Sequence, residues 1–417
     1  MIHQINSCRV CAEKNIKKFF NLGEQPLANS LAVTQNILDQ VYPLSLSWCP
    51  ECNLIQLNHT VEPEVLFSQY VWVSSTSSTA RKYAERFCDL LLQRVICQTK
   101  NAYVLELASN DGTFLKPFIT HGFRVLGIDP AKNIVGMANN DGIPTICAFF
   151  GAETAQKIIS ENDKPDIVFA RNVLPHVANT HDFVEGVRLS MDNNTLLAIE
   201  VHYAGTILQE LHYDSIYHEH LCYFSLKSLQ CLLNRQGIYL YDIEKSPISG
   251  GSIVVFGSLK KRQKSSSLLQ YEENEKKHNI NTLESWENFA KTSHLHKEHF
   301  NKLIDDTVIT TSNISAWGAS ARSSTLLNFC GIGNDKIVGI ADKSSLKQNL
   351  YSPGTHIPIH SPDQIMASKP DCMVILAWNF LDEIVNELKN QYNFKGTIII
   401  PFPYPPKLKT IKEITCD

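Results

Sequence analysis

The chain has 417 residues, a length that suggests about three domains. Apolar residues make up 43% and charged residues 19%, which is ordinary for a globular protein and excludes a disordered chain. The net charge is −4 with neutral histidines, so the field of the whole chain attracts neither nucleic acid nor an anionic membrane.

The first residues and the cysteines indicate the compartment. The sequence MIHQINSCRVCAEKN has no cationic stretch followed by an apolar run, so we expect no secretory signal. No window approaches about 18 consecutive apolar residues, and no membrane-spanning helix is expected. Four of the 12 cysteines form two CxxC pairs and the others lie in mostly apolar segments. We therefore expect reduced thiols and a cytoplasmic protein.

The middle of the chain alternates between strand and helix patterns. Residues 1–75 are rich in turns and cysteines, and residues 80–96 then form a predicted helix. Short apolar runs that end at turns are typical of buried parallel strands with helices on both faces of the sheet. They lie at residues 102–108, 124–130, 144–150, 166–172 and 195–201. Residues 237–258 resemble an antiparallel pair that closes this sheet.

The last part of the chain repeats the alternation. Residues 261–310 are charged and helix-forming, and we predict a helical connector there. Residues 311–417 again carry short apolar strands between helices. We therefore predict an α/β fold with an N-terminal module, a central Rossmann-like domain at residues 76–260 and a second Rossmann-like α/β domain at the C-terminal end.

Two CxxC pairs predict a metal site in residues 1–75. Cys8 and Cys11 form one pair, and Cys49 and Cys52 form the other. Four thiolates complete a tetrahedral structural zinc site and leave no open position for chemistry. The alternatives are four unrelated thiols or a redox pair, although neither pair opens a helix after a strand. The module shows no cluster of Lys and Arg, which argues against nucleic-acid binding.

Residues 104–113, a strand that ends in a polar turn, predict a cofactor site. The turn follows a strand and opens a helix, and no GxGxxG fingerprint is present, which disfavours a dinucleotide-dependent dehydrogenase. The acidic residue and the turn backbone are expected to face the methionine part of S-adenosylmethionine. These residues are Glu106, Ser109, Asn110, Asp111 and Gly112. Asp129, followed by Pro130, ends the next strand and is expected to accept hydrogen bonds from the ribose.

Residues after the next strands are expected to line the same pocket. Arg171 and Asn172 end the strand at residues 166–172 and His176 follows it, at the edge of the sheet where ligands bind. Phe150 is a candidate to stack near the adenine, and a plain core position is its alternative.

The segment 213–224 is the densest polar and aromatic stretch and the candidate catalytic segment. Removing a proton beside a ketone needs a base with a pKa near neutral, which imidazole supplies. The resulting enolate needs nearby donors such as Tyr hydroxyls. A merely structural polar loop is the alternative. Zinc binding by His218 and His220 is disfavoured by their i, i+2 spacing and the lack of a fourth ligand.

Taken together, these motifs resemble a family, the three-domain zinc-containing sugar C-methyltransferases that use S-adenosylmethionine and act on nucleotide-linked 4-keto-deoxysugars. The resemblance spans residues 8–405. It rests on the two CxxC pairs and on residues 23–29 (GEQPLAN), 74–77 (SSTS), 110–112 (NDG), 217–220 (YHEH), 352–359 (SPGTHIPI) and 377–380 (AWNF).

The resemblance implies roles for individual residues. It implies that His220 is the general base at C3 of the sugar, that Tyr217 and Glu219 position the substrate or stabilise the enolate, and that His176 lies beside them. It also implies that the C-terminal domain helps to bind the sugar nucleotide. Tyr70 and Trp72 are expected to form an aromatic wall of the substrate pocket. Ser249 and Gly250 are assigned to the substrate as well, and Ser249 stands where the family usually has His.

The turn at residues 317–325 predicts a phosphate contact in the last domain. The helix N-terminus would suit a pyrophosphate, with Arg322 as a cation and Lys347 after the next strand within reach. Small residues there also allow close packing of a helix on a strand, which is the alternative.

The sequence thus predicts a methyltransferase that acts at C3 of a 4-keto-deoxysugar, most simply one linked to thymidine diphosphate, in the biosynthesis of a branched-chain deoxysugar. Methylation at a sugar oxygen or nitrogen, and a non-catalytic zinc-bearing interaction protein, are the alternatives. The expected partner is the nucleotide sugar, with no nucleic acid and no membrane. The sequence leaves the oligomeric state open and is compatible with a monomer.

Overall fold

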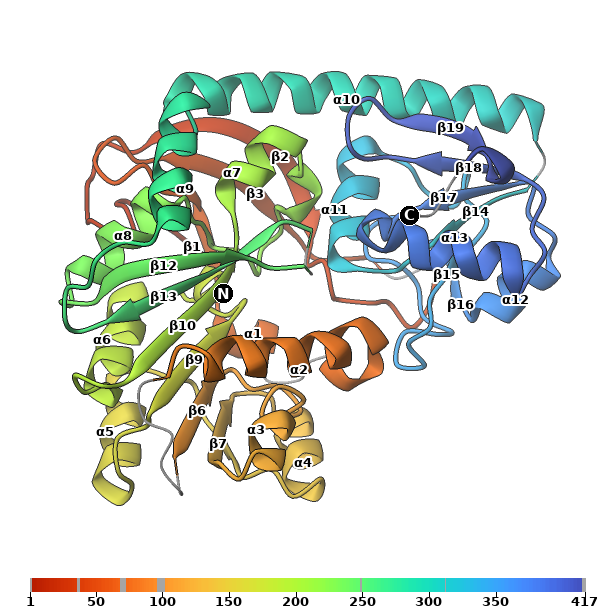
Figure 1. The fold of residues 1–417 in the computed structure, drawn as a ribbon. Coiled ribbons are helices and arrows are strands. Elements are labelled where there is room, and N and C mark those ends of the chain that lie inside the picture. Colours follow the sequence, from red (N-terminus) through yellow and green to blue (C-terminus); the bar gives the residue numbers. More distant parts are fainter. Residues whose placement is uncertain are drawn as a thin grey trace. The chain divides into compact units, whose positions relative to one another are not determined.

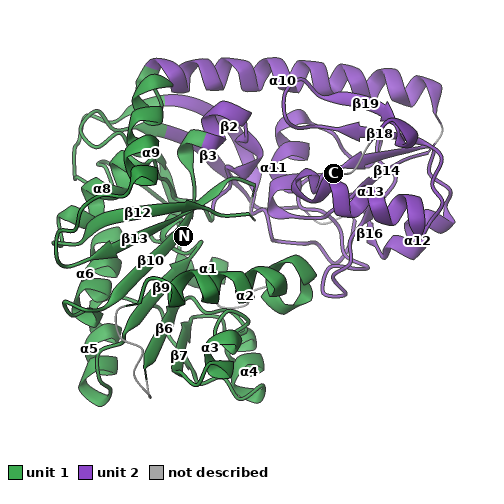
Figure 2. Ribbon diagram, viewed as in Figure 1, with its two compact units in different colours: residues 1–18, 47–205, 219–283 green, residues 19–46, 206–218, 284–417 purple. Residues whose placement is uncertain are grey.

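The computed structural model describes residues 2–35, 38–67, 73–95, 102–247, 250–311 and 313–414. Contacts between residues divide the chain into two compact units, which Figure 2 colours separately. Unit 1 comprises residues 1–18, 47–205 and 219–283, and unit 2 comprises residues 19–46, 206–218 and 284–417. The boundaries of the three domains and of the helical connector at residues 261–310 remain predictions.

Unit 1 is built on a seven-stranded sheet with the order β12-β13-β10-β9-β6-β7-β8 (Figure 1). The strands β10, β9, β6, β7 and β8 are parallel, and β13 pairs antiparallel with both β10 and β12. This confirms the predicted parallel sheet and its antiparallel closing pair. The strands are β6 (Tyr103–Leu107), β7 (Arg124–Asp129), β8 (Thr145–Cys147), β9 (Ile167–Arg171), β10 (Leu196–His202), β12 (Tyr239–Lys245) and β13 (Ser252–Ser258).

Helices cover both faces of this sheet, with α3 and α4 on one side and α5 and α6 on the other (Figure 1). Every residue of β6, β10 and β13 is therefore buried, which explains their continuous apolar character. The predicted helix at residues 80–96 is α2 (Ser78–Leu92), which begins where the Ser77 side chain accepts a hydrogen bond from Ala80 N. The other helices are α3 (Lys116–Thr120), α4 (Lys132–Asn140), α5 (Ala152–Glu161), α6 (Thr180–Ser190), α7 (Ala204–Glu210), α8 (Leu226–Asn234) and α9 (Ser266–Lys277).

The strand order reverses between β6 and β9. The chain proceeds from β6 to β7 and β8 in one direction and from β9 to β10 in the other. The loops after β6 and β9 therefore diverge, and such a switch point is where open α/β sheets bind ligands. The predicted cofactor turn follows β6, and the predicted residues from 171 to 176 follow β9.

Unit 2 contains a six-stranded sheet with the order β16-β15-β14-β17-β18-β19, in which only β19 pairs antiparallel. The order reverses again, here between β14 and β17, and confirms a second Rossmann-like unit. The strands are β14 (Ile314–Trp317), β15 (Ile340–Ala341), β16 (Ile359–His360), β17 (Cys372–Ile375), β18 (Thr397–Ile400) and β19 (Lys407–Thr410). The helices are α10 (Leu283–Thr310), α11 (Ala321–Cys330), α12 (Pro362–Ala367) and α13 (Leu381–Asn390).

The N-terminal part of the chain is mostly strand and turn, as predicted. Strands β1 (Ile2–Gln4) and β5 (His59–Val61) pair antiparallel. A four-stranded sheet has the order β11-β4-β3-β2, and the chain passes between the two units within β2 and β3. The elements are β2 (Lys17–Pro26), β3 (Val41–Trp48), β4 (Ile55–Leu57), β11 (Cys222–Tyr223) and the short helix α1 (Pro63–Phe67).

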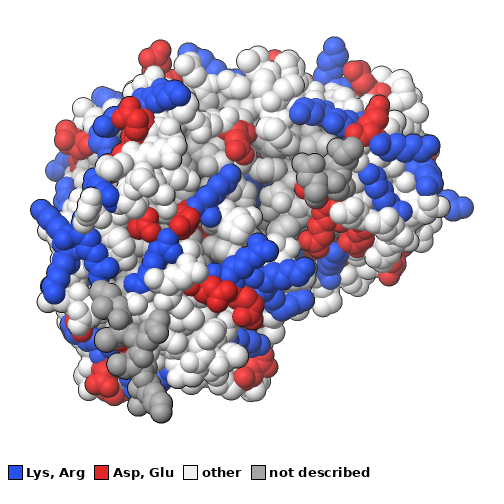
Figure 3. Space-filling model, viewed as in Figure 1, with Lys and Arg blue, Asp and Glu red and all other residues white. Residues whose placement is uncertain are grey.

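The surface that Figure 3 shows carries charges of both signs. Lys and Arg side chains lie among Asp and Glu side chains on the face that Figure 3 shows. Within the described ranges, no helix combines the length and the apolar character needed to cross a membrane. The described cysteines are free of disulfide bonds.

Candidate cofactor and catalytic sites

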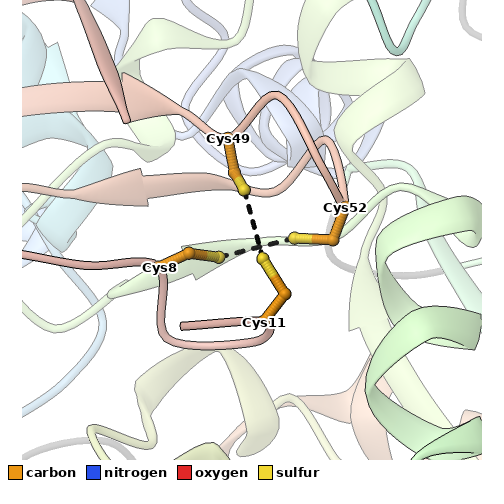
Figure 4. Close-up of side chains that lie close together, drawn as sticks. All are labelled: Cys8, Cys11, Cys49 and Cys52. Carbon is orange, nitrogen blue, oxygen red and sulfur yellow. Dashed lines mark hydrogen bonds between the residues drawn. The ribbon is translucent and has the colours of Figure 1, made fainter. Parts of the chain in front are cut away.

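Cys8, Cys11, Cys49 and Cys52 point their sulfur atoms toward one another (Figure 4). All four sulfur atoms lie within 4.8 Å of each other, with Cys8 and Cys52 at 3.4 Å and Cys11 and Cys49 at 3.3 Å. Tetrahedral Zn–S bonds of about 2.3 Å place the sulfur atoms roughly 3.8 Å apart, so this cluster matches the donor geometry of a closed zinc site.

The chemistry of the cluster also fits a cation. Hydrogen bonds from Cys52 and Cys8 lower the pKa of Cys49, whereas the hydrogen bond with Cys49 raises the pKa of Cys8 and of Cys52. Cys8, Cys49 and Cys52 are therefore close enough to shift one another's pKa. Four thiolates in this volume require a divalent cation among them, and with no open position the ion has a structural role.

The turn after β6 adopts left-handed backbone at alternate positions. Ala108, Asn110 and Gly112 have φ angles of 57°, 50° and 74°. Gly112 has a second constraint, because a Cβ atom there would lie 2.5 Å from Cδ1 of Ile143. The alternation turns the chain sharply at the switch point and into the turn that precedes α3.

Carboxylates hold this turn in place. Asp129, at the end of β7, accepts hydrogen bonds from Asn110 N and from Ala131 N, each at 2.9 Å. Asp111 accepts one from Ser75 N at 3.0 Å, and Asn110 Oδ1 accepts one from Ser74 N at 2.9 Å. The predicted cofactor residues thus form one connected structure with the motif at residues 74–77.

Two buried polar atoms beside the turn lack a hydrogen-bond partner among the described residues. They are Oε2 of Glu106 and Oγ of Ser109. Burial raises the pKa of Glu106 well above its ordinary value, against the opposing charge of Arg171. Acceptors left unsatisfied in a buried site are costly, and a cationic ligand group with N–H donors would satisfy them. The residues present therefore fit the amino-acid part of S-adenosylmethionine.

Arg171 has a partner that sequence reasoning missed. Its Nε donates to Oε2 of Glu200 at 2.7 Å, and Ser246 Oγ donates to the other oxygen of Glu200 at 2.7 Å. The guanidinium lies over the ring of Phe114, with Cζ 3.2 Å from its centroid. The available signal was Glu200 itself, which is a charged residue in an otherwise apolar strand and is fully buried.

The remaining predicted cofactor residues lie at the same sheet edge. Asn172 has a φ angle of 51° and donates its backbone N–H to Glu200 O at 2.8 Å. Pro130 directly follows Asp129, and its carbonyl accepts a contact from the thiol of Cys147 at 3.7 Å. Phe150 is partly buried, and its ring packs edge-on against Phe183 of α6, with the ring centroids 5.4 Å apart.

His176 and His220 lie side by side in unit 1. Their ring centroids are 4.8 Å apart, and His220 also faces Tyr223 at 6.3 Å. Leu221 N donates to Pro175 O at 2.7 Å, which fixes the segment after His220 against the turn that carries His176. Glu219 is buried, so the segment places a carboxyl group and two imidazoles in one region.

The pair is electrostatically asymmetric. Burial lowers the pKa of His176 to about 4, although hydrogen bonds with the backbone of Glu219 and Asn172 oppose this shift. His176 is therefore neutral at physiological pH. A neutral His176 places no positive charge beside His220.

The other predicted substrate residues are distributed. Tyr217 is partly buried and belongs to unit 2, since the division of the chain falls between His218 and Glu219. Gly250 has a φ angle of 63° in the turn between β12 and β13. Tyr70, Trp72 and Ser249 lie outside the described residues.

The two cations predicted to reach phosphate have protein partners in unit 2. Arg322 forms an ion pair with Asp214, in which two guanidinium nitrogens donate at 3.0 and 2.8 Å. Lys347 Nζ is buried, donates to Ala319 O at 2.7 Å and lies 3.7 Å from an oxygen of Asp342. Their phosphate contacts remain predictions.

Comparisons with known proteins agree with this arrangement along the chain. Residues 8–67 match a family model described as a zinc binding domain, residues 80–242 match a methyltransferase domain, and residues 247–403 match a C-methyltransferase C-terminal domain. Together with the loop geometry and the four-cysteine cluster, they define an S-adenosylmethionine-dependent methyltransferase with a structural zinc site.

The chain belongs to the C-methyltransferase family that combines these three domains. It is 32% identical over 409 residues to C-methyltransferase NovU of Streptomyces niveus, and the alignment covers 97% of each protein. Solved structures with partial similarity include the PH0226 protein from Pyrococcus horikoshii OT3 (TM-score 0.37, 16% identity, 46% of this chain and 95% of that chain). Another is magnesium protoporphyrin IX methyltransferase from Synechocystis PCC 6803 (TM-score 0.34, 12% identity, 43% of this chain and 82% of that chain).

Proposed function

We propose that this C-methyltransferase acts at C3 of a nucleotide-linked 4-keto-deoxysugar, with thymidine diphosphate as the simplest nucleotide, in the biosynthesis of a branched-chain deoxysugar. The observation that carries the proposal is that the ring of His220 lies beside the ring of a neutral His176, with their centroids 4.8 Å apart. Carbon methylation needs a base for a carbon-bound proton, and methylation of a sugar oxygen or nitrogen needs no such proton transfer from carbon.

In the proposed reaction His220 removes the proton from C3, and the C–H electron pair moves toward the C4 carbonyl to form an enolate. Tyr217 and Glu219 position the sugar, and the hydroxyl of Tyr217 donates a hydrogen bond to the developing oxyanion. S-adenosylmethionine, which the turn after β6 and Asp129 would hold, would supply an electrophilic methyl group for C3 and keep the S–CH3 electron pair on its sulfur.

We assign the nucleotide to the loops of unit 2 and, from its reduced cysteines, the protein to the cytoplasm. Neither assignment depends on which nucleobase the substrate carries. Ser249 and Gly250 are assigned to sugar selection, in line with the departure of this segment from the family's sequence.

Deuterium exchange tests the proposal. A thymidine diphosphate-linked 4-keto-6-deoxyhexose is incubated in D2O with the enzyme and S-adenosylhomocysteine, and the hydrogen at C3 is followed by NMR. We expect exchange with the wild type and none above background with His220→Ala, whose affinity for S-adenosylhomocysteine should be unchanged. Exchange at the wild-type rate in His220→Ala would remove His220 from the base role. Methyl transfer by the wild type without C3 exchange would exclude the enolate.

A further inference from the structure

Asp214 brings together three sequence motifs in unit 2. It lies in the short helical turn Tyr213–Ser215, at the start of the candidate catalytic segment. Its two oxygens accept hydrogen bonds from Arg322, near the start of α11, at 3.0 and 2.8 Å. One oxygen also accepts the indole N–H of Trp378 at 2.8 Å, and the guanidinium lies 4.5 Å from the Trp378 ring centroid.

These contacts occupy the switch point of the second sheet. Arg322 follows β14 and Trp378 follows β17, the two strands between which the strand order reverses. This is where an open α/β sheet binds its ligand. In unit 2 the carboxylate of Asp214, which is part of the protein and not of a ligand, lies at this position. Only 1% of the Asp214 side chain and 14% of the Arg322 side chain are exposed.

Further contacts hold the same segment on unit 2. Tyr213 donates its hydroxyl to Nδ1 of His296 at 2.7 Å, and Nε2 of His296 donates to Pro401 O at 2.7 Å. Thr325 Oγ1 donates to Ile216 O at 2.9 Å. The segment is therefore held through the side chains of residues 213 and 214 and through the backbone of residue 216, and Tyr217 is the next residue.

We infer that Asp214 is a positioning residue for the catalytic segment, and that Arg322 and Trp378 act through it. The inference rests on the proposed function, because it gives the anchored segment the task of holding Tyr217 at the substrate. It assigns Arg322 to a protein carboxylate rather than to the pyrophosphate of the nucleotide. Unit 2 thus uses a ligand-binding position of its fold to fix a loop.

A double-mutant cycle on the full-length, zinc-loaded enzyme tests this inference. The variants are Asp214→Asn, Arg322→Gln and the combination of both, with Trp378→Phe as a milder change that removes the N–H donor and keeps an aromatic ring. The control is Lys336→Gln, which removes another ion pair of unit 2, that of Lys336 with Asp305 at 2.6 Å. The readouts are kcat, KM for the nucleotide sugar, C3 deuterium exchange, affinity for S-adenosylhomocysteine and the melting temperature.

We expect Asp214→Asn and Arg322→Gln to lower kcat and C3 exchange by similar factors, on the order of 100-fold, because a displacement of about 1 Å has that effect. The double variant should lose no more than either single variant. Affinity for S-adenosylhomocysteine should stay at the wild-type value in every variant, because its predicted residues lie in unit 1. The kcat and C3 exchange of Trp378→Phe should lie between those of the wild type and those of Asp214→Asn. Lys336→Gln should match the wild type in both.

Two results would overturn the inference. One is an increase in KM with Arg322→Gln alone, with kcat unchanged and no effect of Asp214→Asn, which is the behaviour of a phosphate ligand. The other is wild-type C3 exchange in both Asp214→Asn and Trp378→Phe. If Asp214→Asn does not fold, Trp378→Phe and Arg322→Lys decide between these results. Absence of C3 exchange in the wild type would contradict the proposed function and not this inference, so the two failures are distinguishable.

Discussion

Asp129 and Asp342 make the same pair of backbone hydrogen bonds in the two sheets. Asp129 is the last residue of β7, and Asp342 directly follows β15. Asp129 accepts from Asn110 N and Ala131 N, both at 2.9 Å, and Asp342 accepts from Ala319 N at 2.9 Å and from Ser344 N at 2.8 Å. In both units, therefore, a carboxylate fixes the loop after the first strand at the switch point.

This equivalence gives a matched pair of variants. Asp129→Asn places an amide NH2 group against one backbone donor and should weaken binding of S-adenosylhomocysteine by about 10- to 100-fold, since a hydrogen bond to a charged group contributes about 1.5–3 kcal/mol. Asp342→Asn should leave that affinity unchanged. Isothermal titration calorimetry measures both. Equal losses in the two variants would show that the effect is general destabilisation and not loss of the cofactor turn.

The Arg171–Glu200 ion pair should act on the amino-acid part of the cofactor. Replacing both residues by Gln removes both charges without leaving either buried alone. We expect this double variant to bind S-adenosylhomocysteine about 10-fold more weakly and to bind 5′-methylthioadenosine, which has no carboxylate, as the wild type does. Competition titrations with the two ligands separate these effects. A parallel loss for both ligands would restrict the ion pair to a structural role.

His176 should remain neutral until the pH approaches 4, because burial lowers its pKa to about that value. The folded pKa lies below the unfolded value of about 6.5, so the unfolded chain binds more protons between these values and stability falls as the pH decreases through this window. NMR titration of ring-labelled histidines measures the pKa of His176, and the His176→Gln variant identifies its resonance. A midpoint near 6.5 would contradict the argument that His220 has a neutral neighbour.

The zinc site should support the fold and not the chemistry. Cys49→Ser removes one of four ligands and should reduce bound zinc below one ion per chain and lower the melting temperature, since binding of a structural metal contributes directly to folding. Cys231→Ser is the control, because Cys231 lies outside the cluster. Metal analysis and thermal unfolding provide the readouts. If folded Cys49→Ser protein kept its zinc but lost turnover, the metal would have a catalytic role instead.

The sequence alone was sufficient for features that depend on local patterns. Short apolar runs between helices predicted both sheets, because strands buried on two faces must be continuously apolar. The CxxC pairs predicted a metal site because two residues separate the ligands in each pair. The turn from Ser109 to Gly112 was recognisable because its polar residues follow a strand directly and precede a helix.

Only the tertiary structure decided which charges meet. Arg322 is predicted as a phosphate ligand from its place near a helix N-terminus, and the partner that the structure shows for it, Asp214, lies 108 residues earlier in the chain. Glu200 and Arg171 are 29 residues apart, and nothing in their spacing indicates a pair. An ion pair depends on where two strands or helices end in space, and the strand order that brings those ends together is a property of the folded chain.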